Sequence, residues 1–195
     1  MIHNIILDMG GVLMQHNIPG CIARLKELTG DNFARLGIDD KGEGTGLMEQ
    51  FERGLVSLDE FLKQVLALCL PGTTQEQVLE AWVTIHAGIP QERMAYVKQL
   101  KAQGYKLYLL SNNNDACWKD IEDHYDMSVF DDLFLSHMLH VVKPQPALFE
   151  YVQDKLHLNP DETVFVDDIE VNRLAAEQAV GWHTADSLDA LKAML

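Results

Sequence analysis

The chain has 195 residues, enough for one sizeable hydrophobic core or for one core with a small accessory domain. Its 30 acidic and 15 basic residues give a formal net charge of −15, which argues against nucleic acid or an anionic membrane surface as a main partner. Three well-separated cysteines, Cys21, Cys69 and Cys117, fit reduced thiols better than a disulfide framework or a zinc site. The N-terminus lacks the features of a signal peptide, and no apolar stretch approaches the length of a membrane span. We therefore expect a soluble, cytoplasmic protein.

The first predicted element is a buried strand that ends in a carboxylate. Three consecutive apolar residues follow Asn4, as in the central strands of parallel sheets, and Asp8 comes directly after them. Gly10 and Gly11 then allow the backbone to turn sharply and to approach a ligand closely. Ligands of open α/β sheets bind beyond the carboxyl ends of strands, so Asp8 is a candidate functional residue. The alternative is an aspartate that only caps a helix or a turn.

Residues 16–86 are predicted to be helical. Ile18-Pro19 opens one helix that Gly30 closes, Ser57 begins a second with the pattern of a capping box, and Thr74 with Gln77 begins a third. The polar, glycine-rich residues 37–46 are expected to form a mobile loop. A helical insert directly after the first strand indicates a separate lid, although a bundle that only completes the core is the other interpretation.

The remainder of the chain alternates between helices and strands. Predicted helices cover residues 90–103, 115–125, 145–156, 170–180 and the chain from 187, and predicted strands cover residues 105–110, 133–136, 163–166 and 182–184. Repeated βα units imply a parallel sheet with right-handed crossovers and helices on both faces. The fold class is therefore α/β, with a Rossmann-like, doubly wound core formed by residues 1–15 and 87–195 and an all-helical cap formed by residues 16–86.

Polar groups follow several of the predicted strands. Ser111-Asn112 and Asp167-Asp168 come directly after strands, as Asp8 does, and Lys143 lies on a loop before a helix. Each alone has an ordinary explanation, such as a helix cap or a solvated loop charge. Together they converge on one edge of one sheet, which favours a functional site.

These motifs carry a family resemblance. DMGGVL (residues 8–13), LLSN (109–112), Lys143-Pro144 and VFVDD (164–168) resemble, in this order, the motifs of the haloacid dehalogenase-like hydrolases, specifically the phosphatases with a helical cap. Phe51-Glu52-Arg53-Gly54 and residues 57–61 are similar to the cap of the subgroup that includes bacterial α-D-glucose-1-phosphate phosphatases.

The resemblance implies a magnesium-dependent phosphatase that acts on a small phosphorylated metabolite, a sugar phosphate first, as a monomer or small homo-oligomer. Asp8 would be the nucleophile that forms an aspartyl-phosphate. Mg²⁺ would be held by the Asp8 and Asp168 side chains, by the Gly10 carbonyl and, through a water, by Asp167. Lys143, the Ser111 hydroxyl and the Asn112 backbone N–H would bind the phosphate.

One position departs from the family pattern. Most of these phosphatases have a second aspartate where this chain has Gly10, and that aspartate assists proton transfer. Three explanations stay open: a leaving group that needs little protonation, such as an anomeric oxygen; a substitute such as His16; or a weak or non-catalytic relative that only binds phosphate ligands. A 2-haloacid dehalogenase is the enzymatic alternative, but it needs no metal, so Asp167 and Asp168 count against it.

Overall fold

The computed structural model describes residues 1–39 and 44–195, so part of the predicted loop 37–46 lies outside the described residues. Its centre is a five-stranded sheet in the order β5-β4-β1-β6-β7. The strands, all parallel to their neighbours, are β1 (Asn4–Leu7), β4 (Lys106–Ser111), β5 (Asp132–Leu135), β6 (Thr163–Val166) and β7 (His183–Ala185). The predicted doubly wound α/β core is confirmed.

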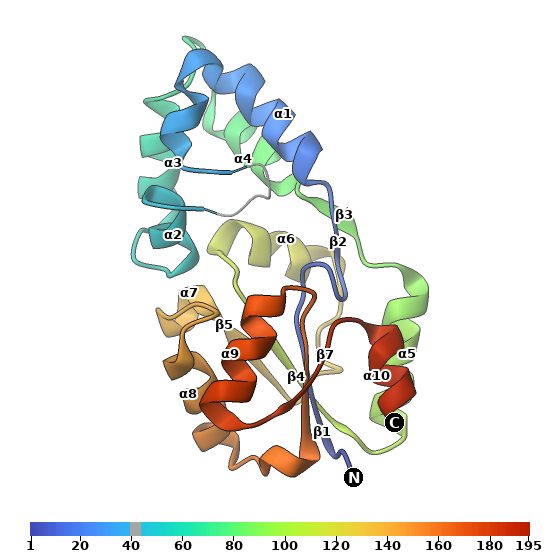
Figure 1. Cartoon of the computed structure of the whole chain (residues 1–195). Coiled ribbons are helices and arrows are strands. Elements are labelled where there is room, and N and C mark those ends of the chain that lie inside the picture. Colours follow the sequence, from blue (N-terminus) through green and yellow to red (C-terminus); the bar gives the residue numbers. More distant parts are fainter. Residues whose placement is uncertain (40–43) are drawn as a thin grey trace.

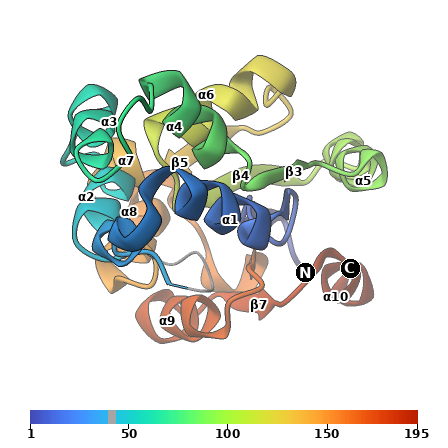
Figure 2. The same ribbon diagram turned by 90° about the horizontal axis from the view of Figure 1, so that it is seen from above.

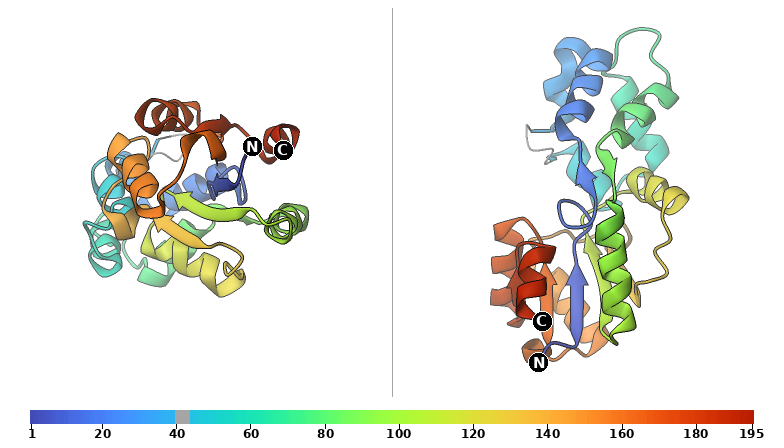
Figure 3. Two further views of the ribbon diagram at one scale, coloured as in Figure 1. Left: turned by 90° about the horizontal axis from the view of Figure 1, so that it is seen from below. Right: turned by 90° about the vertical axis from the view of Figure 1, so that its right-hand side faces the viewer.

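Alternate residues of the central strand β1 are buried on opposite faces of the sheet. Ile5 and Leu7 belong to a core cluster with residues of α5 (Gln91–Ala102), α6 (Asp115–His124) and α10 (Leu188–Met194). Ile6 belongs to a second cluster with residues of α8 (Pro146–Leu156) and α9 (Glu170–Val180). Figures 1 and 3 show the sheet between these two layers of helices. Burial on both faces explains the continuous apolar run of β1.

A second group of helices lies beyond the carboxyl ends of the strands, above the sheet in Figure 1 and nearest the viewer in Figure 2. It consists of α1 (Ile18–Thr29), the 3₁₀ helix η1 (Gly30–Leu36), α2 (Leu47–Glu52), α3 (Leu58–Leu66) and α4 (Gln75–Val83). These helices share their own hydrophobic cluster, to which α6 adds Ala116 and Cys117. Thr74 and Gln77 form the reciprocal capping box at the start of α4.

Two features that the sequence analysis did not predict join the helical group to the rest. The strands β2 (Gln15–His16) and β3 (His86–Gly88) pair antiparallel where the chain enters and leaves the helices. At the end of α2, the Ser136 hydroxyl donates to the Glu52 carbonyl at 2.6 Å, and Arg53 Nε donates to the His140 carbonyl at 3.3 Å. Ser136 begins the short helix α7 (Ser136–Leu139), so the helical insert also contacts the core at a distance from its connecting strands.

The predicted helices and strands of the core agree with the structure to within one or two residues at each end. The elements that were missed are short: η1, α2, α7, the 3₁₀ helix η2 (Pro160–Glu162), β2 and β3. Within the described part of the chain, no helix is both long and apolar enough to cross a membrane.

Candidate active site

The register of the sheet places two aspartates side by side. Leu7 of β1 pairs with Val166 of β6, so Asp8 and Asp167 are the next residues of neighbouring strands. Asp8 is 6% exposed and Asp167 is fully buried. The Lys143 Nζ lies 2.8 Å from the Asp8 carboxylate and 2.6 Å from the Asp167 carboxylate. One ammonium group is thus shared by two buried carboxylates.

The backbone around Lys143 is held by Asn112, which follows β4. The Asn112 side chain accepts the Lys143 N–H at 2.8 Å and donates to the Lys143 carbonyl at 3.0 Å. The peptide bond between Lys143 and Pro144 is cis. Asn112 thereby joins the loop after β4 to the loop that carries the lysine.

Asp167 accepts hydrogen bonds from three residues. Its carboxylate accepts the Ile169 N–H at 2.9 Å and the Asn172 amide at 3.1 Å on each oxygen, in addition to Lys143. Asn172 is buried on the first turns of α9. These bonds fix the direction in which Asp167 presents its charge to Lys143.

The ionisation of the site follows from burial and the uneven charge. Burial, and the charge of Asp167, raise the pKa of Asp8 to about 7 against the opposing effect of Lys143. Burial would lower the pKa of Lys143, but the two carboxylates outweigh it and raise that pKa. Burial and Asp167 also raise the pKa of Asp168. The site therefore has an excess of negative charge that a bound cation would balance.

The donor set suits a hard divalent cation. Asp8, Asp167 and Asp168 each offer a carboxylate oxygen within 4.8 Å of the others. A Cβ at Gly11, where φ is +73°, would lie 2.2 Å from a carboxylate oxygen of Asp168, so the glycine makes room for this side chain. Clustered carboxylate oxygens are the ligands that Mg²⁺ prefers.

The loop after Asp8 is fastened by Arg93 of α5. Its guanidinium donates to the carbonyls of Gly11, Val12 and Leu13 at 3.1, 2.8 and 3.3 Å. Within the loop, the Met14 N–H donates to the Met9 carbonyl at 2.7 Å, and the Met9 N–H donates to the Asp8 carboxylate at 2.7 Å. The orientation of Asp8 therefore depends on a closed turn that the core holds in place.

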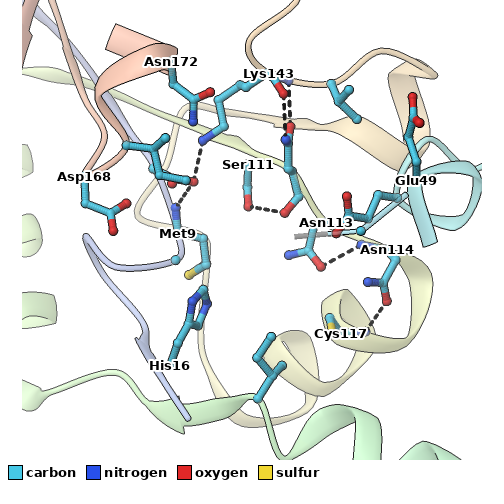
Figure 4. A pocket seen from close by; sticks show the side chains of 18 of the residues that line it. Met9, His16, Glu49, Ser111, Asn113, Asn114, Cys117, Lys143, Asp168 and Asn172 are labelled. Atoms are coloured by element: carbon cyan, nitrogen blue, oxygen red, sulfur yellow. Dashed lines mark hydrogen bonds and ion pairs between the residues drawn. The ribbon is translucent and has the colours of Figure 1, made fainter. Parts of the chain in front are cut away.

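These groups lie at the floor of a cavity of about 710 Å³ between the sheet and the helical insert. Figure 4 shows Lys143, Asp168, Ser111 and His16 around it. The insert and its connecting strands contribute walls that include Ile18, Glu49, Glu52, Trp82, Ile85 and His86, and the loops after β4 and before α8 contribute Asn112, Asn113, Asn114 and Gln145.

The structure brings together every residue that the sequence analysis selected. Asp8, Gly10, Ser111, Asn112, Lys143 and Asp168 line the cavity, and Asp167 is buried directly behind Lys143. Asn172, Arg93 and Ser136 were missed. Asn172 stands five residues after Asp167 in a helix-forming sequence, and only its place on the buried face of α9 shows that it binds Asp167. Arg93 binds a loop some eighty positions away in the sequence, so no local pattern indicates its contact.

The fold and the site together define an α/β protein with a carboxylate cluster at the carboxyl edge of a parallel sheet and a helical insert above it. The family model of haloacid dehalogenase-like hydrolases matches residues 2–179, and the chain belongs to this family.

Among characterised relatives, a D-ribitol-5-phosphate phosphatase of Bacteroides thetaiotaomicron is 34% identical over 181 residues, which cover 86% of this chain and 84% of the relative. A sesquiterpene phosphatase of Aspergillus oryzae is 32% identical over 189 residues, covering 94% and 90% of the two chains. A similar solved structure is a haloacid dehalogenase family enzyme from B. thetaiotaomicron, an aspartate-to-alanine mutant in complex with magnesium and inorganic phosphate. It has a TM-score of 0.86 and 28% identity, covering 95% of this chain and 94% of that one.

Proposed function

We propose that this hydrolase is a magnesium-dependent phosphatase for a small phosphorylated metabolite, with a sugar or sugar-alcohol monophosphate as the first candidate. The observation that carries the proposal is the position of Lys143, whose ammonium group contacts Asp8 at 2.8 Å and Asp167 at 2.6 Å on the floor of the cavity. The phosphatase names of two relatives that align along most of this chain support it.

In the proposed reaction the Asp8 carboxylate attacks phosphorus and the ester oxygen leaves, which forms an aspartyl-phosphate. Water then attacks the same phosphorus, the bond from phosphorus to the Asp8 oxygen breaks, and inorganic phosphate leaves. Lys143 lies against the Asp8 carboxylate, where its charge favours the approach of an anionic phosphate. The Ser111 hydroxyl and the Asn112 backbone N–H bind phosphate oxygens in this proposal.

When bound, Mg²⁺ supplies the charge that brings a carboxylate and a phosphate dianion together. The Asp8 and Asp168 carboxylates and the Gly10 carbonyl would hold it directly, and Asp167 would contribute through a water. The buried Asp167 carboxylate also holds Lys143, because it accepts a hydrogen bond from the ammonium group. Asp167 is itself positioned by a hydrogen bond from the Asn172 amide.

We further propose that residues 16–86 act as a cap and residues 1–15 with 87–195 as the catalytic core. The helical insert supplies one wall of the cavity and closing it would exclude water from the phosphorylated aspartate. Amides and carboxylates around the cavity, among them Asn113, Gln145 and Glu49, offer hydrogen-bond partners for the hydroxyl groups of a sugar or a sugar alcohol. Glucose-1-phosphate and D-ribitol-5-phosphate are therefore the first two substrates to compare.

The test is phosphate release from a panel of metabolite monophosphates, with Mg²⁺ and with a chelator. We expect Mg²⁺-dependent turnover that Asp8→Asn abolishes while the far-ultraviolet circular dichroism stays unchanged. Turnover that is equal in chelator, or a fully active Asp8→Asn variant, would refute the proposal. Halide release from 2-haloacids would identify a dehalogenase instead, and thermal stabilisation by phosphate esters without turnover would identify a binding relative.

A further inference from the structure

The side chain of His16 occupies the space beside Gly10 that any larger residue at position 10 would need. A Cβ built on Gly10 would lie 2.3 Å from Cε1 and 2.7 Å from Nε2 of this imidazole. Gly10 is only two residues from Asp8, and both line the cavity with His16. In Figure 4 the imidazole stands beside Met9 and faces the cavity opposite Ser111. The absence of a side chain at position 10 thus admits an imidazole from β2 to the neighbourhood of Asp8.

Four of the other titratable groups that line the cavity either have a charged partner or hold their proton. His86 Nδ1 lies 2.6 Å from the Asp120 carboxylate, which belongs to α6. Lys143 is bound to two carboxylates, and burial raises the pKa of the Cys117 thiol to about 12, which keeps it protonated. Glu49 is paired with Arg53 at 3.7 Å on the insert. Among the described residues the His16 side chain has no hydrogen-bond or ion-pair partner, and it is exposed and lines the cavity.

Resting on the proposed function, we propose that His16 is a catalytic residue that accepts the proton of the attacking water during hydrolysis of the aspartyl-phosphate. The water oxygen forms a bond to phosphorus, the bond between phosphorus and the Asp8 oxygen breaks, and one water proton moves to the imidazole. Asp8 regains its carboxylate and inorganic phosphate leaves. The imidazole, which is open to the cavity, then returns its proton to solvent or to the leaving oxygen of the next ester. General base assistance of this kind contributes about 10²–10⁴ in rate.

The experiment compares the wild-type protein with His16→Gln and with His183→Gln, using p-nitrophenyl phosphate and Mg²⁺. His183 is an exposed residue of β7 outside the cavity and serves as the matched control. Rapid-quench samples are analysed by intact mass for phosphorylated protein, beside the rate of nitrophenol release. We expect His16→Gln to lower steady-state turnover about 10²-fold or more, with a burst of nitrophenol and accumulation of phosphorylated protein, while His183→Gln behaves as wild type.

A double variant tests whether a proton acceptor of another kind, placed in the space of the His16 imidazole, restores turnover. His16→Ala vacates the space into which a residue at position 10 would project, so Gly10→Asp in that background places a carboxylate there. We expect the double variant to recover at least about tenfold of the turnover that His16→Ala loses. The inference is wrong if His16→Gln turns over at the wild-type rate, if its slow turnover is not accompanied by phosphorylated protein, or if the folded double variant shows no recovery. A wild-type protein without turnover would refute the proposed function instead.

Discussion

The triad of Asp8, Lys143 and Asp167 predicts a large energetic coupling that a double-mutant cycle measures. The Lys143 Nζ lies 2.6 Å from Asp167, and both side chains are almost completely buried. Removing Lys143 leaves two buried carboxylates without their cation, which costs about 3–5 kcal/mol, whereas removing the charge of Asp167 leaves Lys143 paired with Asp8. For a chain of this length, 1 kcal/mol shifts the unfolding midpoint by about 2–4 °C. We therefore expect Lys143→Met alone to lower the midpoint by about 6–20 °C, and Asp167→Asn alone to lower it less because Lys143 keeps its contact with Asp8.

The double variant Lys143→Met/Asp167→Asn removes both charges and should be more stable than the sum of the single losses predicts, by about 2 kcal/mol. The assay is chemical or thermal unfolding in chelator, so that no divalent ion neutralises the remaining carboxylates. Lys119 and Asp123 form the matched control, because their ion pair has the same 2.6 Å distance but is exposed to solvent. The same cycle at that pair should show no measurable coupling. Additive losses at Lys143 and Asp167, within about 0.5 kcal/mol, would refute this account of the site.

Three further predictions concern the pKa of Asp8, the contact that Gly54 makes with α7, and the hydrogen bonds that Arg93 donates to the loop after Asp8. Because the pKa of Asp8 is raised to about 7 in the folded protein, protonation of this carboxyl stabilises the fold. That stabilisation is complete below pH 3.8 and is lost as the pH rises through about 7, so the protein in chelator should lose thermal stability between these values. Stabilisation by Mg²⁺, measured by calorimetry, should grow over the same range; a Mg²⁺ effect that does not change with pH would contradict the shift. Gly54→Ala should loosen the contact of α2 with α7, because φ at Gly54 is +61° and the new Cβ would lie 2.0 Å from the His137 carbonyl oxygen. We expect faster proteolysis after residue 53 and a higher KM. Unchanged proteolysis would show that this contact does not hold the insert. Arg93→Met should lower kcat about tenfold or more with little change in the fold, because three carbonyls of the Asp8 loop lose their donor; an unaltered kcat would mean that the loop holds Asp8 without it.

The core elements were predictable because their local signals and their tertiary environment agree. The run after Asn4 is apolar because β1 is covered on both faces, and the same holds for β6 and Phe165. The helices of the core carry recognisable starts and stops, such as Pro146 and Gly181. The elements that were missed have at most seven residues, too few for a periodic pattern, and they depend on contacts with distant segments, as α2 does on Ser136.

The candidate site was predictable as a set of residues but not as an arrangement. Asp8, Ser111-Asn112 and Asp167-Asp168 follow strands, and parallel strands present their carboxyl ends at one edge. The sequence does not show that Asp167 and Asp168, although adjacent, have different surroundings. Only the register shows that Asp167 is buried behind Lys143 with Asn172, while Asp168 reaches the cavity beside Gly11.

By itself the sequence determined the α/β class, the helical insert and the candidate residues, because burial periodicity and strand-end polar residues are local properties of the chain. Tertiary structure alone decided which groups meet. It placed one ammonium between two carboxylates, fastened the Asp8 loop with Arg93 and set the His16 imidazole against Gly10. These contacts depend on strand register and on the docking of the insert, where a displacement of a few ångströms removes a hydrogen bond, and no local pattern encodes distances of that kind.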